Sequence, residues 1–319
     1  MAERSKKINF YDSEIIKQIN SETIKLFNKY KMDMELRELS PNTIDQYSSD
    51  LTQWFIYIYN NQGNQCITEL TEDDLTEFFY YCKKEGNNSR RMKRRMSSIS
   101  ALYKYLQKKR LVKENPMMFI DRPQKDVDVM TQTFLSKEQV EEMKRQLQLM
   151  VDENSKNLQL QVYALFSLST MARVTAVSSI KWEQVDLEER VCNDVLEKEG
   201  KIVTLYFSEE VKQLLIKLKE YREENNINDY GYVFMSGDNK PLDTCTFNDW
   251  CKKIGRLINV PTLHPHDFRH SGSQLLKLAG CPIEQISELL NHSSLDVTKK
   301  FYLRADKKKI REEKDKYDI

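Results

Sequence analysis

The residues best suited to chemistry lie in the last third of the chain. All four histidines of the 319 residues fall between positions 264 and 292, and Arg269 lies among them. His266 and Arg269 are three residues apart, so at the start of a helix they share one face, where a guanidinium can hold two phosphate oxygens. The six cysteines are scattered without CxxC spacing, which argues against zinc. The cluster therefore favours an acid/base and phosphate site, with histidines that are merely neighbours in the core as the alternative.

The elements around these histidines follow from turn and capping residues. Residues 270–280 read as a helix with Gly280 as its C-cap, and residues 281–290 read as a second helix that Pro282 opens. Residues 291–298 form a turn into a third helix that carries an aromatic pair, Phe301 and Tyr302. Three short helices in succession would hold the polar residues together.

In this order, the motifs resemble the C-terminal signature of tyrosine recombinases, the phage integrases. The matching motifs are HDFRH at 266–270, a helix ending Ala-Gly at 279–280, an Ile-x-x-Leu-Leu run at 286–290, His-Ser-Ser at 292–294 and Thr-x-x-aromatic at 298–301. Arg173, followed by Ile180, Trp182 and Val185-Asp186, resembles the first arginine box of the same family.

The resemblance implies a mechanism and a set of site residues. In the family a tyrosine oxygen attacks the scissile phosphate and forms a 3′-phosphotyrosine, while paired arginines and histidines neutralise the transition state without metal or cofactor. A lysine on a β-hairpin protonates the leaving 5′ oxygen. The positions that match the phosphate-binding residues are Arg173, His266, Arg269 and His292, with Lys198 as the hairpin lysine and Lys201 as an alternative to it.

Three positions depart from the family pattern. The Gly-Leu that precedes the first arginine is Met171-Ala172 here, and the acidic residue three positions after that arginine is Ala176, which removes a supporting carboxylate. The nucleophile is expected nine residues after His292, where Phe301 stands, and Tyr302 is one residue late. Because successive helix residues point about 100° apart, a regular helix would turn Tyr302 away from the arginines. A bulge would restore Tyr302, and an engineered Tyr-to-Phe change at Phe301 is a further alternative.

A strongly basic segment lies in the first half of the chain. The net charge is only +1, but residues 83–113 hold twelve Lys or Arg against one acid, Glu85. Apolar residues at helical spacing predict one buried face, with Ser89 as the cap of the helix and basic residues displayed beside it. Such a density indicates a polyanion partner, with a solvated charged face as the alternative. The resemblance implies that this partner is double-stranded DNA. The residues predicted to bind it are Arg90, Arg91, Lys93, Arg94, Arg95 and Lys104.

Two domains are expected, mainly α with a small β-hairpin over 195–207. The helices opened by Ser40-Pro41 and Thr71 resemble the SAM-like core-binding domain of the same recombinases, whose catalytic domain follows a linker. A linker would let the two lobes close around a duplex as a clamp. The predicted segments are a tail at 1–14, a core-binding domain at 15–119, a linker at 120–130, a catalytic-type domain at 131–305 and a charged tail at 306–319.

The composition, 39% hydrophobic and 31% charged with no long apolar run, is typical of a soluble cytoplasmic protein of a bacterial cell or phage-infected host, with no membrane partner. Ala176 and Phe301 favour a sequence-specific DNA-binding protein without recombinase activity, acting as a phage-type transcriptional repressor. The alternative is an active recombinase or integrase that uses Tyr302, or a trapped form of one. A pure protein-interaction module would leave the basic segment unexplained. In the family, tails like 306–319 dock on a neighbouring subunit, which implies self-association on DNA.

Overall fold

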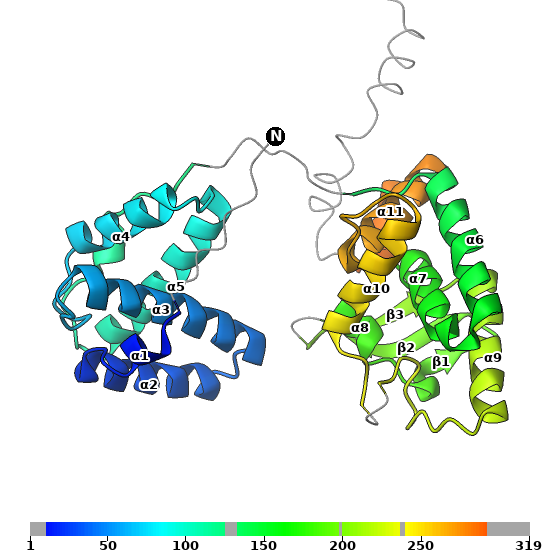
Figure 1. Cartoon of the computed structure of the whole chain (residues 1–319), viewed down its shortest axis with the longest axis horizontal. Helices are drawn as coiled ribbons and strands as arrows, with labels where there is room; N and C mark the ends of the chain where they lie inside the picture. Colours follow the sequence, from blue (N-terminus) through cyan, green and yellow to red (C-terminus); the bar gives the residue numbers. More distant parts are fainter. Residues whose placement is uncertain (1–10, 125–132, 198–199, 237–239, 292–319) are drawn as a thin grey trace, which may run out of the picture. The chain divides into compact units, whose positions relative to one another are not determined.

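The computed structural model describes residues 11–124, 133–197, 200–236 and 240–291. Within these ranges the chain is mainly helical and carries one three-stranded sheet, which confirms the predicted fold class. Its internal contacts divide into two compact units, residues 1–130 and 131–319 (Figure 1). The finer segment boundaries drawn from the sequence stay predictions.

The first unit is a group of helices whose starts follow from their capping residues. Ser40 accepts a hydrogen bond from the Thr43 backbone N–H at 3.3 Å, and Thr71 forms a capping box with Asp74. The expectation that Ser89 caps the basic helix is wrong, because Asn88 accepts from the Arg91 N–H at 3.0 Å and Ser89 is the first helical residue. The elements are α1 Ser13–Ile16, α2 Ser21–Leu36, α3 Pro41–Asn61, α4 Glu72–Lys84, α5 Ser89–Lys108 and the 3₁₀ turn η1 Pro116–Phe119.

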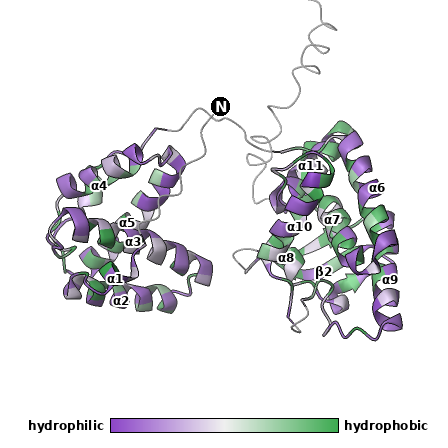
Figure 2. Cartoon of the chain, in the orientation of Figure 1, coloured by the Kyte–Doolittle hydropathy of each residue, from purple (hydrophilic) through white to green (hydrophobic). Residues whose placement is uncertain are grey.

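Aromatic residues fill the core of this unit, as expected from their helical spacing. Trp54 of α3, Phe78 of α4 and Tyr103 of α5 are all fully buried. The Tyr103 hydroxyl donates to the Ile67 carbonyl at 2.8 Å, so its polar atom is satisfied inside the core. Both hydrophobic and hydrophilic residues occur on most helices in Figure 2, as amphipathic packing requires.

The second unit places a small antiparallel sheet beside a bundle of helices. Its strands are β1 Val185–Asp186, β2 Val191–Leu196 and β3 Ile202–Tyr206, in the order β1-β2-β3. Val195 pairs with Val203 and Leu196 with Ile202, which confirms the predicted hairpin, although β2 starts earlier than expected and β1 was not predicted. The helices are α6 Lys137–Glu153, α7 Leu158–Thr170, α8 Val174–Ser178, α9 Glu209–Glu224, α10 Thr244–Leu257, α11 Pro265–Leu278 and α12 Ile283–Leu289, with 3₁₀ turns η2 Ser155–Asn157 and η3 Trp182–Gln184.

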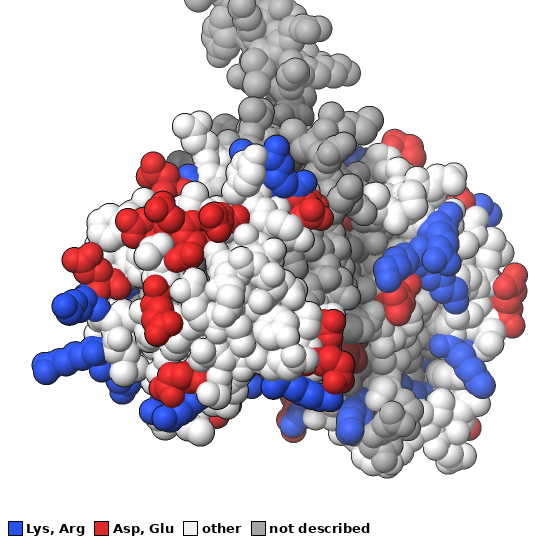
Figure 3. Space-filling model, turned by 60° about the vertical axis from the view of Figure 1, so that its left-hand side comes forward, with Lys and Arg blue, Asp and Glu red and all other residues white. Residues whose placement is uncertain are grey.

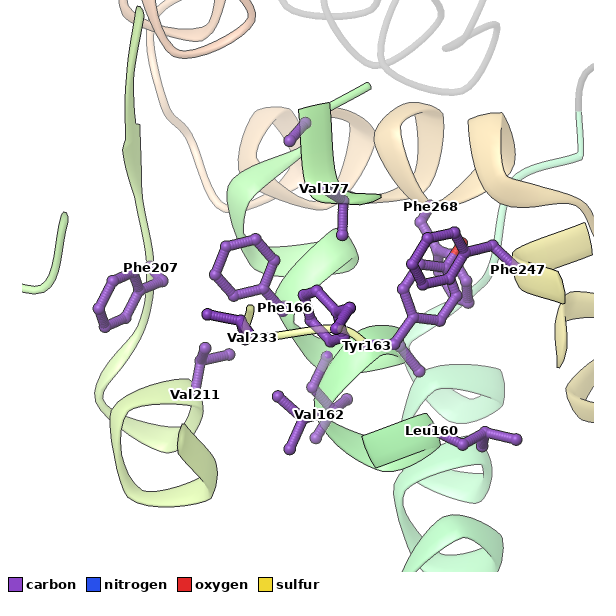
Figure 4. Close-up of a cluster of buried hydrophobic side chains, with 14 of the residues drawn as sticks. Leu160, Val162, Tyr163, Phe166, Val177, Phe207, Val211, Val233, Phe247 and Phe268 are labelled. Carbon is purple, nitrogen blue, oxygen red and sulfur yellow. The ribbon is translucent and has the colours of Figure 1, made fainter. Parts of the chain in front are cut away.

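Helix α7 is the centre of this unit. Nearly all of its side chains are buried, and it packs against α6, α9 and α11. Tyr163 of α7 stacks on Phe247 with ring centroids 4.3 Å apart and meets Phe268 edge-on at 6.0 Å (Figure 4). No helix among the described residues has both the length and the apolar character to cross a membrane. The central position of α7 fixes the loop that follows it, which carries Arg173.

Candidate active site

The end of α7 sets the direction of the first predicted arginine. The helix stops at Thr170, because Met171 adopts the left-handed conformation with φ 54°. Arg173 therefore lies outside the apolar helix and is the N-cap residue that immediately precedes α8. Its side chain is 33% exposed, so part of the arginine side chain reaches solvent.

Helix α11 begins with the motif that carries the second arginine. The Asp267 carboxylate accepts from the His264 backbone N–H at 2.9 Å and lies 3.0 Å from His264 Nδ1. Burial raises the pKa of Asp267 above its usual value. This cap, with Pro265 in the first turn, fixes the helix start and so places His266 and Arg269 in the helix's first turns, as predicted.

A glycine lets α11 approach α7 closely. A Cβ atom on Gly272 would collide with the Leu168 backbone carbonyl and lie 2.8 Å from the Met171 side chain. The two helices therefore pack backbone to backbone at this point, which brings the start of α11 near the loop after α7. This contact is a physical reason for glycine at position 272.

Arg269 lies inside the protein. It is 4% exposed, and its guanidinium donates to the Met171 carbonyl at 2.7 Å and to the Leu290 carbonyl. It thus joins the end of α7 to the end of α12 through charge-assisted hydrogen bonds. Of the two predicted arginines, Arg173 is the one that reaches solvent in this structure, whereas Arg269 lies beneath the surface.

His266 lies in the field of both arginines. The pKa of His266 is below its usual value because its ring is partly removed from water and because the positive charges of Arg269, His264 and Arg173 disfavour protonation. The His266 and His270 rings meet edge-on with centroids 4.4 Å apart. The structure therefore brings three of the predicted site residues near one another, and the two arginines disfavour the protonated form of the histidine.

The β2–β3 hairpin is attached to the same site at two points. Glu197, which directly follows β2, forms an ion pair with Arg173. On the other side of the hairpin, Lys201 Nζ donates to the Asn291 carbonyl at 2.9 Å. Lys201 therefore lies beside the segment that leads to position 292. Lys198, the first choice for the hairpin lysine, falls outside the described residues.

Glu197 was missed by the sequence analysis. Its side chain is fully buried, and it follows the alternation of β2, where Val195 also points inward. An acidic residue at an inward position of a strand is rare unless it is paired, and this was the signal available in the sequence. Three other predicted positions, His292, Phe301 and Tyr302, lie outside the described residues, as does the tail at 306–319.

The basic segment of α5 is only partly displayed. Arg95 is 1% exposed, and it donates to Asn87 Oδ1 and to Gln53 Oε1, both at 2.9 Å. The expectation that Arg95 faces a DNA partner is therefore wrong for this structure, because its guanidinium is used inside the unit.

The neighbouring arginines of α5 share a buried acid. The Asp50 carboxylate binds Arg94 through two hydrogen bonds of 2.9 Å and lies 3.4 Å from Arg91. Arg94 and Arg91 remain 37% and 27% exposed, so both still reach solvent in fixed orientations. Arg90 and Lys104 are exposed. On the molecular face in Figure 3, basic and acidic side chains lie next to one another in several places, with local groups of each sign.

Both units match protein families that are already known. Residues 133–309 match the Phage integrase family, and residues 27–110 match the N-terminal SAM-like domain of phage integrases. A tyrosine recombinase XerC of Leptospira interrogans is 30% identical over 299 residues, 92% of this chain and 91% of that protein. A tyrosine recombinase XerD of Listeria monocytogenes is 24% identical and covers 82% of this chain and 88% of its own length.

Solved structures share the fold at lower identity. The Tn1549 transposon integrase in complex with transposon right end DNA has a TM-score of 0.70 at 16% identity, over 92% of this chain and 98% of that one. The XerH site-specific recombinase bound to palindromic difH substrate has a TM-score of 0.70 at 15% identity, over 94% of this chain and 91% of that one. The sequence signature, the fold and these matches agree, and the chain belongs to the phage integrase family of tyrosine recombinases.

Proposed function

We propose that this protein binds double-stranded DNA and acts as a site-specific recombinase, with Tyr302 as the nucleophile. The observation that carries the proposal is the proximity of Arg269, His266 and Arg173: Arg269 donates to the Met171 carbonyl, two residues before Arg173, and both arginines act electrostatically on the His266 ring. The XerC relative, matched over 92% of this chain, is named a tyrosine recombinase, which supports the same activity. The family resemblance assigns catalysis to these residues.

Each site residue has a distinct role in the proposed reaction. Arg173 would hold a non-bridging oxygen of the scissile phosphate, and Arg269 would add positive charge from below. The Tyr302 hydroxyl loses its proton to water as its oxygen attacks phosphorus, and the bond to the 5′ oxygen breaks as Lys198 or Lys201 supplies a proton to that oxygen. A 3′-phosphotyrosine results, which the 5′ hydroxyl of another strand then attacks to release the tyrosine. His266 and His292 would assist by hydrogen bonding to the phosphate.

Exposed basic residues of α5 would supply DNA affinity in the first unit. Arg90 and Lys104 are exposed, and Asp50 holds Arg91 and Arg94 in place. Preoriented arginines lose less side-chain entropy when they bind phosphates. Lys93, which is partly exposed, extends the same surface. These contacts would fix the protein on the duplex and carry little sequence information.

A second candidate function is a DNA-binding regulator that does not cut. The observation in its favour is the spacing from His292, which puts Phe301 where the nucleophile is expected. A phenyl ring has no nucleophilic atom, so the same site would then bind a phosphate without breaking it. Such a protein would act as a phage-type transcriptional repressor.

One experiment separates the two functions. The full chain is incubated with fragmented genomic DNA of the source organism, and half of each sample is washed with SDS before the bound DNA is sequenced. A recombinase gives SDS-resistant fragments with the wild type and with Tyr230→Phe, an exposed control tyrosine, but none with Tyr302→Phe. Specific fragments that are retained only without SDS would overturn the recombinase and support the regulator. SDS-resistant fragments with Tyr302→Phe would refute the assigned nucleophile.

A further inference from the structure

Glu197 is the least expected member of the site. It stands at the end of β2, where the Glu197 backbone N–H donates to the Lys201 carbonyl at 2.7 Å and closes the hairpin. Its carboxylate forms an ion pair with Arg173 through Oε2. Oε1 is buried and has no hydrogen-bond partner among the described residues. A buried carboxylate is costly to keep unless its charge is used, so the contact to Arg173 needs an explanation.

The exposures of the two side chains indicate which side of the guanidinium is free. The Glu197 side chain is 0% exposed, whereas Arg173 is 33% exposed. The carboxylate therefore lies wholly inside the protein, while part of the Arg173 side chain remains accessible to solvent. A guanidinium has five N–H donors, so one partner below leaves several for a phosphate above. A carboxylate that competed with the phosphate would instead occupy the exposed side.

Position 176 explains why this contact comes from the hairpin. The family resemblance places a supporting acid there, but Ala176 is fully buried in the hydrophobic core and offers only its backbone N–H, which donates to the Arg173 carbonyl at 2.9 Å. No side-chain oxygen at 176 is available to hold the guanidinium. Glu197 supplies a carboxylate to the same arginine from a different element.

We propose that Glu197 is a positioning residue that orients Arg173 for the DNA phosphate and takes over the part of the acid missing at Ala176. The inference rests on the proposed function, because it assumes that Arg173 binds a phosphate. The carboxylate stands on a strand end closed by a backbone hydrogen bond, so it fixes the guanidinium more firmly than a loop residue would. Glu197 touches neither DNA nor the nucleophile in this scheme.

The test uses a substitution for which loss of charge and loss of positioning change DNA affinity in opposite directions. Glu197→Gln removes a negative charge, which by itself would strengthen binding to a polyanion. If Glu197 positions Arg173, the same change weakens binding of the full chain to its retained DNA fragments by on the order of 10-fold to 100-fold. The slope of log affinity against log salt falls by about 0.9, the loss of one phosphate contact. A purely structural role would change the melting temperature but leave this slope unchanged.

Matched variants make the outcomes distinct. Glu189→Gln, an exposed acid in the β1–β2 turn, is the control for charge removal and is expected to bind at least as well as the wild type. Glu197→Asp keeps the charge and is expected to retain more affinity than Glu197→Gln. The double variant Arg173→Ala/Glu197→Gln leaves no unpaired buried carboxylate and is expected to have the same reduced salt slope as Glu197→Gln.

Two further outcomes distinguish failure of the positioning role from failure of the proposed function. Affinity of Glu197→Gln equal to or above that of the wild type, while the double variant binds weakly, would overturn the positioning role alone. A double variant that binds with wild-type affinity and slope would show that Arg173 contacts no phosphate, which would overturn the proposed function of the site. All variants are compared at a temperature where circular dichroism shows them folded, so lost stability does not imitate lost affinity.

Discussion

Met171 tests how packing and backbone strain compete at the active-site loop. The residue holds φ 54° at the end of α7, a conformation that glycine adopts freely and that costs other residues about 1 to 2 kcal/mol. The family pattern has glycine here. Yet the Met171 side chain is 1% exposed and packs with Ile286 and Leu290 of the α12 region. Met171→Gly would therefore relieve strain and remove buried surface at the same time.

The magnitudes predict that packing dominates. Truncation of a buried methionine costs about 2 to 5 kcal/mol, and the greater freedom of glycine in the unfolded chain adds about 0.5 to 1 kcal/mol. Relief of the left-handed conformation returns about 1 to 2 kcal/mol. Met171→Gly is thus expected to destabilise residues 131–319 by about 3 kcal/mol, the middle of a span of about 0.5 to 5 kcal/mol. With a typical urea dependence, the midpoint falls by about 1 to 2 M.

The assay must follow the second unit separately from the first. Hydrogen exchange of peptides from residues 158–170, measured by mass spectrometry after equilibration in urea, reports the unfolding of α7 directly. Arg190→Gly is the control for strain, since Arg190 is exposed with φ 58° and loses only a surface ion pair with Glu209 at 3.8 Å, which contributes little. It is expected to change stability by about 0 to 1 kcal/mol in the favourable direction. If Met171→Gly proves as stable as the wild type, the packing argument is wrong and backbone strain governs the loop.

Three further predictions concern the basic helix, His266 and the C-terminal tail. Arg95→Met should lower the stability of the first unit by about 1 to 3 kcal/mol, because Asn87 and Gln53 lose their hydrogen-bond donor, and it should leave the salt dependence of DNA binding unchanged. Arg90→Ala should leave the stability unchanged and reduce the salt dependence of DNA binding. Because the pKa of His266 is lower in the folded chain, the unfolded chain binds the proton more tightly, and the free energy of unfolding rises as pH increases toward about 6.5. The difference between the melting temperatures at pH 5.5 and pH 7.5 should therefore be smaller for His266→Gln than for the wild type. Deletion of 306–319 should abolish any DNA-dependent self-association seen by light scattering, and a DNA-bound wild type that is a monomer would contradict the docking hypothesis.

Residues close in sequence were sufficient to predict the helix start that carries His266 and Arg269. Pro265 and the Asp267 cap lie within three residues of each other, so they define the start of α11 and the helical spacing of His266 and Arg269 without tertiary information. The depth of Arg269 was not predictable in the same way. Its burial depends on the Met171 and Leu290 carbonyls, which are distant in sequence and meet only after α7, α11 and α12 pack.

Arg95 shows where residue type misled the sequence analysis. It lies three residues after Met92 and four before Ile99, so helical spacing places it on the buried face. Its charge suggested the opposite. The resolution is that Asn87 and Gln53 supply oxygens inside the unit, and those partners are set by the packing of α3 and the loop before α5. A buried arginine is compatible with periodicity when its hydrogen bonds are satisfied.

The contact between Glu197 and Arg173 weakens one of the two arguments against catalysis that come from departures from the family pattern. Ala176 and Phe301 were two independent arguments against catalysis, and the first assumed that the acid could come only from position 176. Because a carboxylate reaches Arg173 from the hairpin, the loss at 176 no longer implies an unsupported arginine. The argument for a disarmed site then depends on a single spacing, that between His292 and the aromatic pair. A one-residue shift in that spacing is enough to exchange Phe301 for Tyr302, so the choice between recombinase and regulator reduces to whether Tyr302 forms a bond to DNA.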